Sequence, residues 1–238
     1  MTNKNLFKQA FRYKESDCTI ISDIENDIKT ATSSIKSNLK LLEEYIKAHP
    51  LFLFSLNPVA VEDDAPEVVR LMAVASARAG VGPMAAVAGV LADLAVQEMI
   101  SAGCKVAVVE NGGEVSAVSN QPIDIAFAAG DEPLSREMGF RLKQFPIGVA
   151  TSSGRFSHAF SFGDADAVTI FAVDAGLADA AATAVANLIT GDDVTKVIKH
   201  GIKRALSING VTGVFILYRG IVGKAGQVPE LIKVKPQK

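Results

Sequence analysis

Asp179 and Thr183 are separated by three alanines. Positions four apart lie on one face of a helix, and the small alanines leave space around the carboxylate and the hydroxyl. Such a pair of hard oxygen ligands can share a cation such as Mg²⁺, with waters or phosphate oxygens completing its shell. A hydrogen bond between Asp179 and Thr183 that closes a helix pair is the alternative. Asp174, just before this helix, is predicted to cap it.

Two glycine-containing segments are further candidates. Gly112 and Gly113 follow a predicted strand, where they either let a backbone approach a ligand or form a hairpin turn. Their spacing is not that of a dinucleotide or Walker phosphate loop. The stretch MAAVAG at 84–89 follows Gly82 and Pro83 and predicts a helix start whose free amides bind an anion. Ordinary close packing of helices accounts for it equally well.

A hydroxyl-rich loop forms the last candidate. It runs from Thr151 to Gly154, and Arg155 and His158 follow it. These side chains suit contacts to a phosphate or a flavin, and a polar surface loop is the alternative. A Ser/His nucleophile would also need a carboxylate to orient the histidine and donors for an oxyanion, which spacing does not reveal.

The elements that must position these residues follow from hydrophobic periodicity. The pattern predicts a hairpin, a long helix ending before Pro50, an apolar connection, two more helices and then strands. A second group of strands, helices and strands follows. The stretch AGVLAD at 88–93 resembles AGLAD at 175–179, which favours a duplication, although two alanine-rich helices can match by chance. We expect a single domain of two α+β halves, at about 1–130 and 135–238.

The expected ranges, in chain order, are strands at 6–13 and 17–22, helices at 24–49, 66–79 and 84–101, strands at 105–110, 114–119, 123–129, 139–145, 147–151 and 167–173, helices at 175–189 and 192–206, and strands at 211–218 and 231–234.

Composition limits the class of protein. The chain has 238 residues, and 49% of them are hydrophobic. Its longest uncharged windows, 79–92 and 205–218, are shorter than the roughly 18 apolar residues of a membrane span. The polar start, residues 1–8, does not resemble a signal peptide. We therefore expect a cytoplasmic protein that does not enter a membrane. Cys18 and Cys104 are predicted to be buried and reduced, with a reactive thiol as the alternative.

Charge is unevenly distributed along the chain. Residues 51–195 hold 18 acidic and 7 basic side chains, whereas residues 196–238 hold 9 basic and 1 acidic. The basic residues are spread through helix and strand patterns with little aromatic interleaving. We interpret them as a solvated face and expect no nucleic-acid partner. The acidic part holds the candidate metal ligands.

Taken in chain order, these segments resemble the motifs of the ApbE family of flavin transferases, and more closely a shorter soluble branch of that family. The family order is a GAIAKG-type helix start, a GG turn, an ATSG loop and a DALATA helix. The corresponding stretches are MAAVAG at 84–89, NGGE at 111–114, ATSSG at 150–154 and DAAATA at 179–184. The resemblance implies an α+β fold of ApbE-like or T-fold type, a tandem duplication of a strands-helices-strands unit.

The resemblance also implies a site. Asp179, Thr183 and the backbone carbonyl of Ala85 would bind Mg²⁺. The residues that would line the site of a flavin nucleotide, FAD, are Gly112, Gly113, Thr151, Ser152, Ser153, Gly154 and His158. In that reaction Mg²⁺ neutralises the pyrophosphate while a protein threonine or serine attacks phosphorus, so that AMP leaves and FMN stays attached.

The departures from the family pattern leave three hypotheses. Ala88 stands where the family has a lysine, the HxxDPxTG segment is shortened at 158–164, and no lipoprotein leader precedes the domain. The first hypothesis is a Mg²⁺-dependent enzyme acting on a flavin or other nucleotide, by FMN transfer or pyrophosphate cleavage. The second is a protein that binds a small ligand without turnover. The third is a role in sulfur or thiol metabolism that uses Cys18 or Cys104. T-fold proteins assemble through sheet edges, so a homo-oligomer is also expected unless the duplicated chain satisfies its own edges.

Overall fold

The computed structural model describes residues 6–126, 138–153 and 163–234. The first half contains β1 (Phe7–Tyr13), β2 (Ser16–Ser22), α1 (Glu25–Ala48), α2 (Pro50–Phe54), α3 (Glu67–Ala79), the 3₁₀-helix η1 (Pro83–Ala86), α4 (Val87–Ser101), β3 (Ala107–Asn111), β4 (Glu114–Val118) and β5 (Ile123–Ala126). The second half contains β6 (Met138–Leu142), β7 (Ile147–Ser152), β8 (Ala167–Ala172), α5 (Ala175–Ala186), α6 (Val194–Leu206), β9 (Val211–Tyr218), β10 (Ile221–Gly226) and β11 (Glu230–Lys233).

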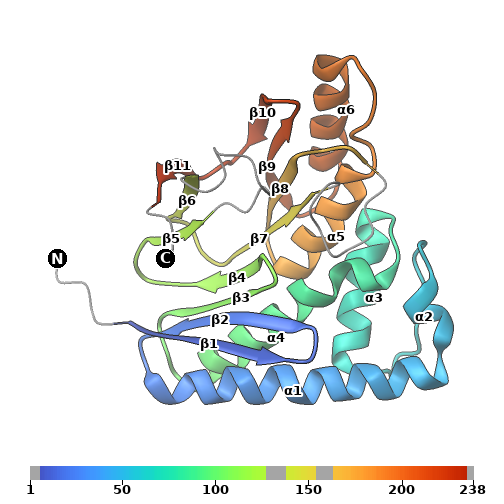
Figure 1. Ribbon diagram of the computed structural model, residues 1–238. Helices are drawn as coiled ribbons and strands as arrows, with labels where there is room; N and C mark the ends of the chain where they lie inside the picture. Colours follow the sequence, from blue (N-terminus) through green and yellow to red (C-terminus); the bar gives the residue numbers. More distant parts are fainter. Residues whose placement is uncertain (1–5, 127–137, 154–162, 235–238) are drawn as a thin grey trace.

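One antiparallel sheet joins the two halves. Its eight strands follow the order β1-β2-β3-β4-β7-β8-β9-β10 (Figure 1). In each half a hairpin comes first, the helices follow, and a second hairpin returns beside the first. The halves meet where β4 pairs with β7, with Val115 opposite Val149. The fold is therefore α+β, a tandem duplication of a strands-helices-strands unit. The boundaries at about 130 and 135 lie next to residues outside the described part of the chain and stay a prediction.

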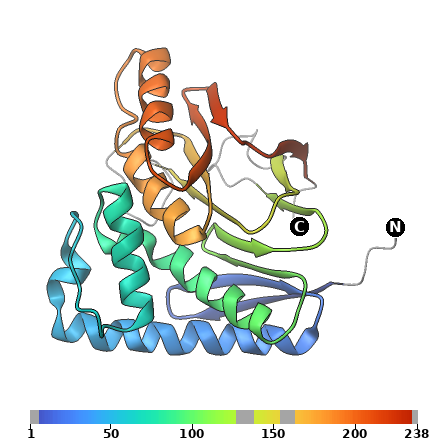
Figure 2. The same cartoon turned by 180° about the vertical axis from the view of Figure 1, so that it is seen from behind.

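The large sheet is covered on both faces. The helices pack on one face, as Figures 1 and 2 show from opposite sides, and the three-stranded sheet β11-β6-β5 packs on the other. Alternation along β3 fits this arrangement, because Ala107 and Val109 face the helices while Val108 faces the small sheet. Phe140 from β6 meets Phe171 and Phe215 edge to face, which fills the space between the sheets.

Several predicted elements differ from the observed ones. The apolar connection after Pro50 begins with the short helix α2, since Pro50 suits the first helical position. The segment 221–226, for which no strand was expected, forms the edge strand β10. Weak strand formers such as Gly223 and Ala225 concealed this strand in the sequence. The single helix predicted at 84–101 divides at Ala86, whose φ of −121° and ψ of 4° interrupt the regular turn.

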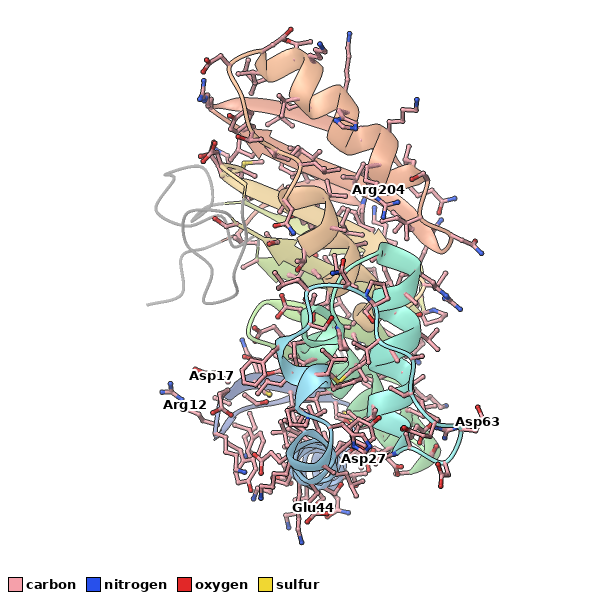
Figure 3. The ribbon with its side chains drawn as sticks, turned by 90° about the vertical axis from the view of Figure 1, so that its right-hand side faces the viewer. Arg12, Asp17, Asp27, Glu44, Asp63 and Arg204 are labelled. Carbon is pink, nitrogen blue, oxygen red and sulfur yellow. The ribbon has the colours of Figure 1, made fainter. Side chains whose placement is uncertain are left out.

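An arginine links the two halves across the helical layer. Arg204 of α6 donates from Nη2 to the carbonyl oxygen of Ala79, at the end of α3, over 2.5 Å. Figure 3 shows Arg204 where α6 meets the end of α3. A cation is favourable at a helix C-terminus, so this contact both bridges the halves and neutralises the end of α3.

One helical segment, Pro83–Ser101, is long and apolar enough to cross a membrane, with 19 residues and a mean hydropathy of 1.4. The expectation from the sequence was based on windows without any charged residue. The segment Pro83–Ser101 contains Asp93 and Glu98, so that criterion did not find it. Half of its apolar window is buried inside the protein, where α4 packs against α1 and α5. The buried core helix of a globular protein passes the same test of length and hydropathy, so this result is weak evidence for a membrane span.

The packing of α5 and α6 over β9 is testable at Tyr218. This fully buried side chain donates its hydroxyl to the carbonyl oxygen of Gly191, in the α5–α6 connection, over 2.8 Å. Tyr218→Phe should lower the free energy of unfolding by about 1 kcal/mol, or Tm by roughly 2–4 °C. Tyr13→Phe is the matched control, because in the described part of the chain no hydrogen bond to the Tyr13 hydroxyl is found. Equal Tm values for the two variants would contradict this account.

Candidate functional site: the crossing of α4 and α5

The predicted ligand Asp179 lies where the first turns of α4 and α5 cross. Its Oδ2 accepts a hydrogen bond from the backbone N–H of Gly89, at 3.1 Å. In the opposite direction, from α4 to α5, the carboxylate of Asp93 accepts hydrogen bonds from the backbone N–H groups of Ala175, at 3.0 Å, and of Gly176, at 2.8 Å. Each helix thus places a carboxylate on the N-terminal amides of the other. The two segments that resemble each other in sequence, 88–93 and 175–179, are the ones that face each other here.

Glycine makes this close approach feasible. A Cβ on Gly89 would lie 2.2 Å from the carbonyl oxygen of Ala175, and one on Gly176 would lie 2.5 Å from Cγ2 of Val90. A methyl group at position 89 would therefore separate the helices. The glycine-framed start of α4 is thus a packing feature as well as a source of amides, and one of those amides is donated to Asp179.

Thr183 shares the face of α5 that carries Asp179. Both residues are partly buried. In the described part of the chain no hydrogen bond joins the two side chains, so the helix pair is closed by the bond from Gly89 rather than by an Asp179–Thr183 bond. Asp174 caps α5 as predicted, with Oδ1 accepting from the N–H of Leu177 at 2.7 Å.

The crossing concentrates negative charge. Burial raises the pKa of Asp179 to about 7; the N–H groups of Gly89 and Ala88 oppose this rise and the charge of Asp93 adds to it. Asp179 as a whole is only partly buried, yet its carboxyl group is deep enough to be desolvated. Burial likewise raises the pKa of Asp93 to about 6. The hydrogen bonds from Ser116 and from the two amides of α5 lower this pKa and so limit the rise. A cation at this point would relieve the repulsion between these carboxylates.

Glu114 is a member of this cluster that the sequence analysis did not single out. It begins β4 directly after Gly113. Burial, and then the charges of Asp179 and Glu110, hold its pKa well above the usual value. The hairpin turn thereby brings a third carboxylate to the crossing. In the sequence, Glu114 could have been noticed because it directly follows the two glycines. Its direction toward α5, however, is set by strand alternation and sheet register.

The amides of the glycine turn are already used within the protein. Gly112 donates to the carbonyl oxygen of Asp17 at 3.0 Å, and Gly113 donates to Oε1 of Glu110 at 2.8 Å. Both glycines have positive φ, 69° and 114°, which L-residues rarely adopt. The segment is thus a hairpin turn, and its role toward a flavin stays a prediction.

The hydroxyl-rich segment is divided by strand alternation. Thr151 and Ser152 belong to β7 rather than to a loop. Thr151 points to the small-sheet side, where its hydroxyl lies 2.9 Å from that of Thr169 in a cavity of about 230 Å³. Ser152 and Ser153 are buried. Gly154 and His158 lie outside the described residues. Thr151 and Asp179 therefore do not share one face of the sheet.

An apolar groove borders the crossing on its α1 side. It has a volume of about 540 Å³ and is lined by residues including Leu39, Leu42, Met84, Ala88 and Gly112. Beside it the buried Asn111 donates from Nδ2 to the carbonyl oxygen of Ala88 at 3.2 Å. The groove joins two of the predicted motif segments, the start of α4 and the glycine turn.

The oxygen atoms of the three predicted ligands, Asp179, Thr183 and Ala85, fit a Mg²⁺ site that waters and phosphates complete. The 3₁₀-helix η1, which contains the partly buried Ala85, packs against α5, so the three predicted ligands come from adjoining elements. Among the described residues no group of three or more His, Cys, Asp or Glu side chains is arranged to hold a metal ion. Carboxylate, hydroxyl and carbonyl oxygens suit Mg²⁺, which keeps waters and substrate phosphates in its shell instead of a cage of side chains.

The two cysteines do not have the environment of reactive thiols. Both are buried and free. Burial raises the pKa of Cys18 to about 12 and that of Cys104 to about 11. Cys18 donates from Sγ to Oδ1 of Asn111 at 3.3 Å. Because the thiolate is the nucleophile, these positions do not support a thiol-based activity.

Comparison with known proteins agrees with this fold. A family model described as "AbpE bacteria" matches residues 2–210. A UPF0280 protein of Methanocaldococcus jannaschii is 41% identical over 231 residues, covering 95% of this chain and 93% of that protein. A UPF0280 protein of Methanococcus vannielii is 38% identical over 234 residues, covering 97% of this chain and 94% of that protein.

Two solved structures share the architecture. The apo flavinyl transferase ApbE of Pseudomonas stutzeri superimposes with a TM-score of 0.56 at 16% identity, covering 93% of this chain and 94% of that one. The ApbE protein of Thermotoga maritima superimposes with a TM-score of 0.58 at 16% identity, covering 93% and 97%. The fold is thus that of an ApbE-like α+β protein. The chain belongs to the family described as AbpE bacteria and is similar to the UPF0280 proteins of methanogenic archaea.

The buried charge of Asp179 predicts a pH dependence of stability. The folded-state pKa is raised from 3.8 to about 7, so the folded state binds more protons and stability falls as the pH rises between these values. In EDTA at pH 8, Asp179→Asn should therefore raise the free energy of unfolding. The difference from wild type should shrink as the pH falls through 7 and vanish below about 4.

Asp124→Asn is a control of opposite sign. The bond from Arg141 lowers the pKa of Asp124, so this carboxylate stabilises the folded protein above its ordinary pKa. Its removal should slightly lower the free energy of unfolding at pH 8. Chemical denaturation across the pH range measures both variants, and an Asp179→Asn protein less stable than wild type at pH 8 would contradict the assignment.

Proposed function

We propose that this protein binds a flavin nucleotide, FAD in the simplest case, together with Mg²⁺ at the α4–α5 crossing, and that it cleaves the pyrophosphate or transfers the FMN part to a hydroxyl group. The observation that carries this proposal is the carboxylate of Asp179. It lies at the start of α4, beside two further acidic side chains, on the helix face shared with Thr183. The fold supports the assignment, since a solved protein that shares it is described as a flavinyl transferase.

Asp179, Thr183 and the carbonyl of Ala85 would hold Mg²⁺, which would neutralise charge on the phosphates as the P–O bond to AMP breaks. Asp93 keeps the first turn of α5 in place. The mainly apolar groove beside Ala88 and Gly112 offers a surface on which an aromatic ring could lie. The protein's part in catalysis is thus mainly to place oxygen ligands and to position the nucleotide.

Incubation with FAD and Mg²⁺ tests this proposal. Mass spectrometry should detect AMP together with free FMN or an FMN adduct, and EDTA should abolish the signal. Asp179→Asn and Thr183→Val should each weaken Mg²⁺-dependent activity by roughly a hundred-fold or more, because even residues outside the ligand shell typically cost 10–100-fold. Thr195→Val, on the exposed face of α6, is the matched control and should match wild type. An active Asp179→Asn protein would contradict the metal assignment.

The second candidate function is binding without turnover, and Ala88 favours it. Where the family has a lysine, this position offers only a methyl group at the edge of an apolar groove, and its carbonyl oxygen accepts from Asn111. No basic side chain is present from 84 to 89 to neutralise phosphate charge.

A lysine at position 88 separates the two candidates. If the protein only binds, flavin fluorescence should report Mg²⁺-dependent FAD binding by the wild type with no AMP, and Ala88→Lys should start AMP release. If the wild type already turns over, Ala88→Lys should change its rate and leave the need for Mg²⁺ intact. An FAD-binding signal that is insensitive to Mg²⁺ in both proteins would contradict both candidates.

A further inference from the structure

Asp93 is absent from the set of predicted ligands, yet its carboxylate makes one half of the helix crossing. The four N-terminal amides of α5 are all satisfied. Leu177 and Ala178 donate to the side chain and carbonyl of Asp174, whereas Ala175 and Gly176 donate to Asp93. The cap from Asp174 is local in sequence, and the contact from Asp93 comes from another helix. Of these two acceptors at the start of α5, Asp93 is the one that relates α5 to α4.

This contact determines how α5 is rotated about its axis. Residues four apart in a helix are about 40° apart around the axis, so Ala175, Asp179 and Thr183 lie along one stripe. The carboxylate of Asp93 holds the first residue of that stripe against α4. A rotation of α5 by one residue, about 100°, would turn both predicted metal ligands away.

Asp93 is itself fixed to the sheet. A hydrogen bond from the hydroxyl of Ser116, on β4, helps to oppose the rise in the pKa of Asp93 that burial causes. Ser116 is buried and lies two residues after Glu114 on the same face of the strand. A continuous path of contacts therefore runs from β4 through Asp93 to the first turn of α5.

We propose that Asp93 is the positioning residue of this site: it fixes the first turn of α5 on α4, so that the Asp179 carboxylate, one turn further along, is held beside Gly89. The function of that carboxylate as a cation ligand rests on the proposed function, whereas its placement does not. Asp93 acts through α5 and is not itself assigned as a ligand.

The test compares Asp93→Asn with Asp174→Asn in the full-length protein. Both substitutions affect hydrogen bonds at the same helix terminus, but only the first affects the crossing. The first readout is amide hydrogen exchange of Gly89 in ¹⁵N-labelled protein without metal. Exchange should rise at least ten-fold in Asp93→Asn and stay near wild type in Asp174→Asn. Equal changes in the two variants, or none in Asp93→Asn, would overturn the proposal.

The second readout is the Mg²⁺ concentration that gives half of the thermal stabilisation. It should rise at least ten-fold in Asp93→Asn and stay unchanged in Asp174→Asn. If the wild type does not respond to Mg²⁺, the proposed function fails, and the Gly89 exchange rate alone decides whether Asp93 fixes Asp179.

A second variant keeps the test decisive if Asp93→Asn does not fold. Gly176→Ala places a methyl group 2.5 Å from Cγ2 of Val90 and so opens the crossing while every carboxylate remains. It should raise Gly89 exchange and the Mg²⁺ midpoint in the same direction. An unchanged Gly89 amide in a folded Gly176→Ala protein would overturn the inference.

Discussion

The close crossing of α4 and α5, in which each helix places a carboxylate on the first turn of the other, is the constraint on which the rest of the structure depends. It joins the two halves of the chain on the helical face, where Asp93 and Asp179 exchange partners. Buried amides at helix ends require acceptors, and carboxylates are favourable there because of the helix dipole. Gly89 and Gly176 are required by the same crossing, since a side chain at either position would intrude between the helices.

The crossing also accounts for the electrostatics of the site. Two carboxylates that serve as helix caps inside one interface are desolvated and repel each other, and the pKa values of Asp93 and Asp179 rise accordingly. Glu114 adds to this repulsion from the hairpin turn. The acidic residues therefore have a structural reason in the crossing, and the same repulsion is what a hard cation bound there would relieve. The structural and functional interpretations of Asp179 are therefore not alternatives.

Position 88 is one of the places where this chain departs from the family pattern, with an alanine instead of a lysine. The groove beside it is apolar and receives no basic side chain from the start of α4. The predicted oxygen ligands Asp179 and Thr183 are present, whereas position 88 supplies no positive charge to a phosphate. That combination is compatible with slow turnover or with binding alone, and the buried thiols with their raised pKa values leave the thiol hypothesis without support.

The sequence by itself determined the element order, the long helix α1, the cap at Asp174 and the spacing of Asp179 and Thr183, because helical periodicity and capping are local properties. It did not determine the strand β10, whose glycine-rich segment is extended only because β9 pairs with it. It also did not separate Thr151 from Asp179, since strand alternation and sheet register decide which face each side chain occupies. Only the tertiary structure brought Glu114 and Asp93 to Asp179, because residues 65 and 86 positions apart meet through the packing of the two halves and not through any local pattern.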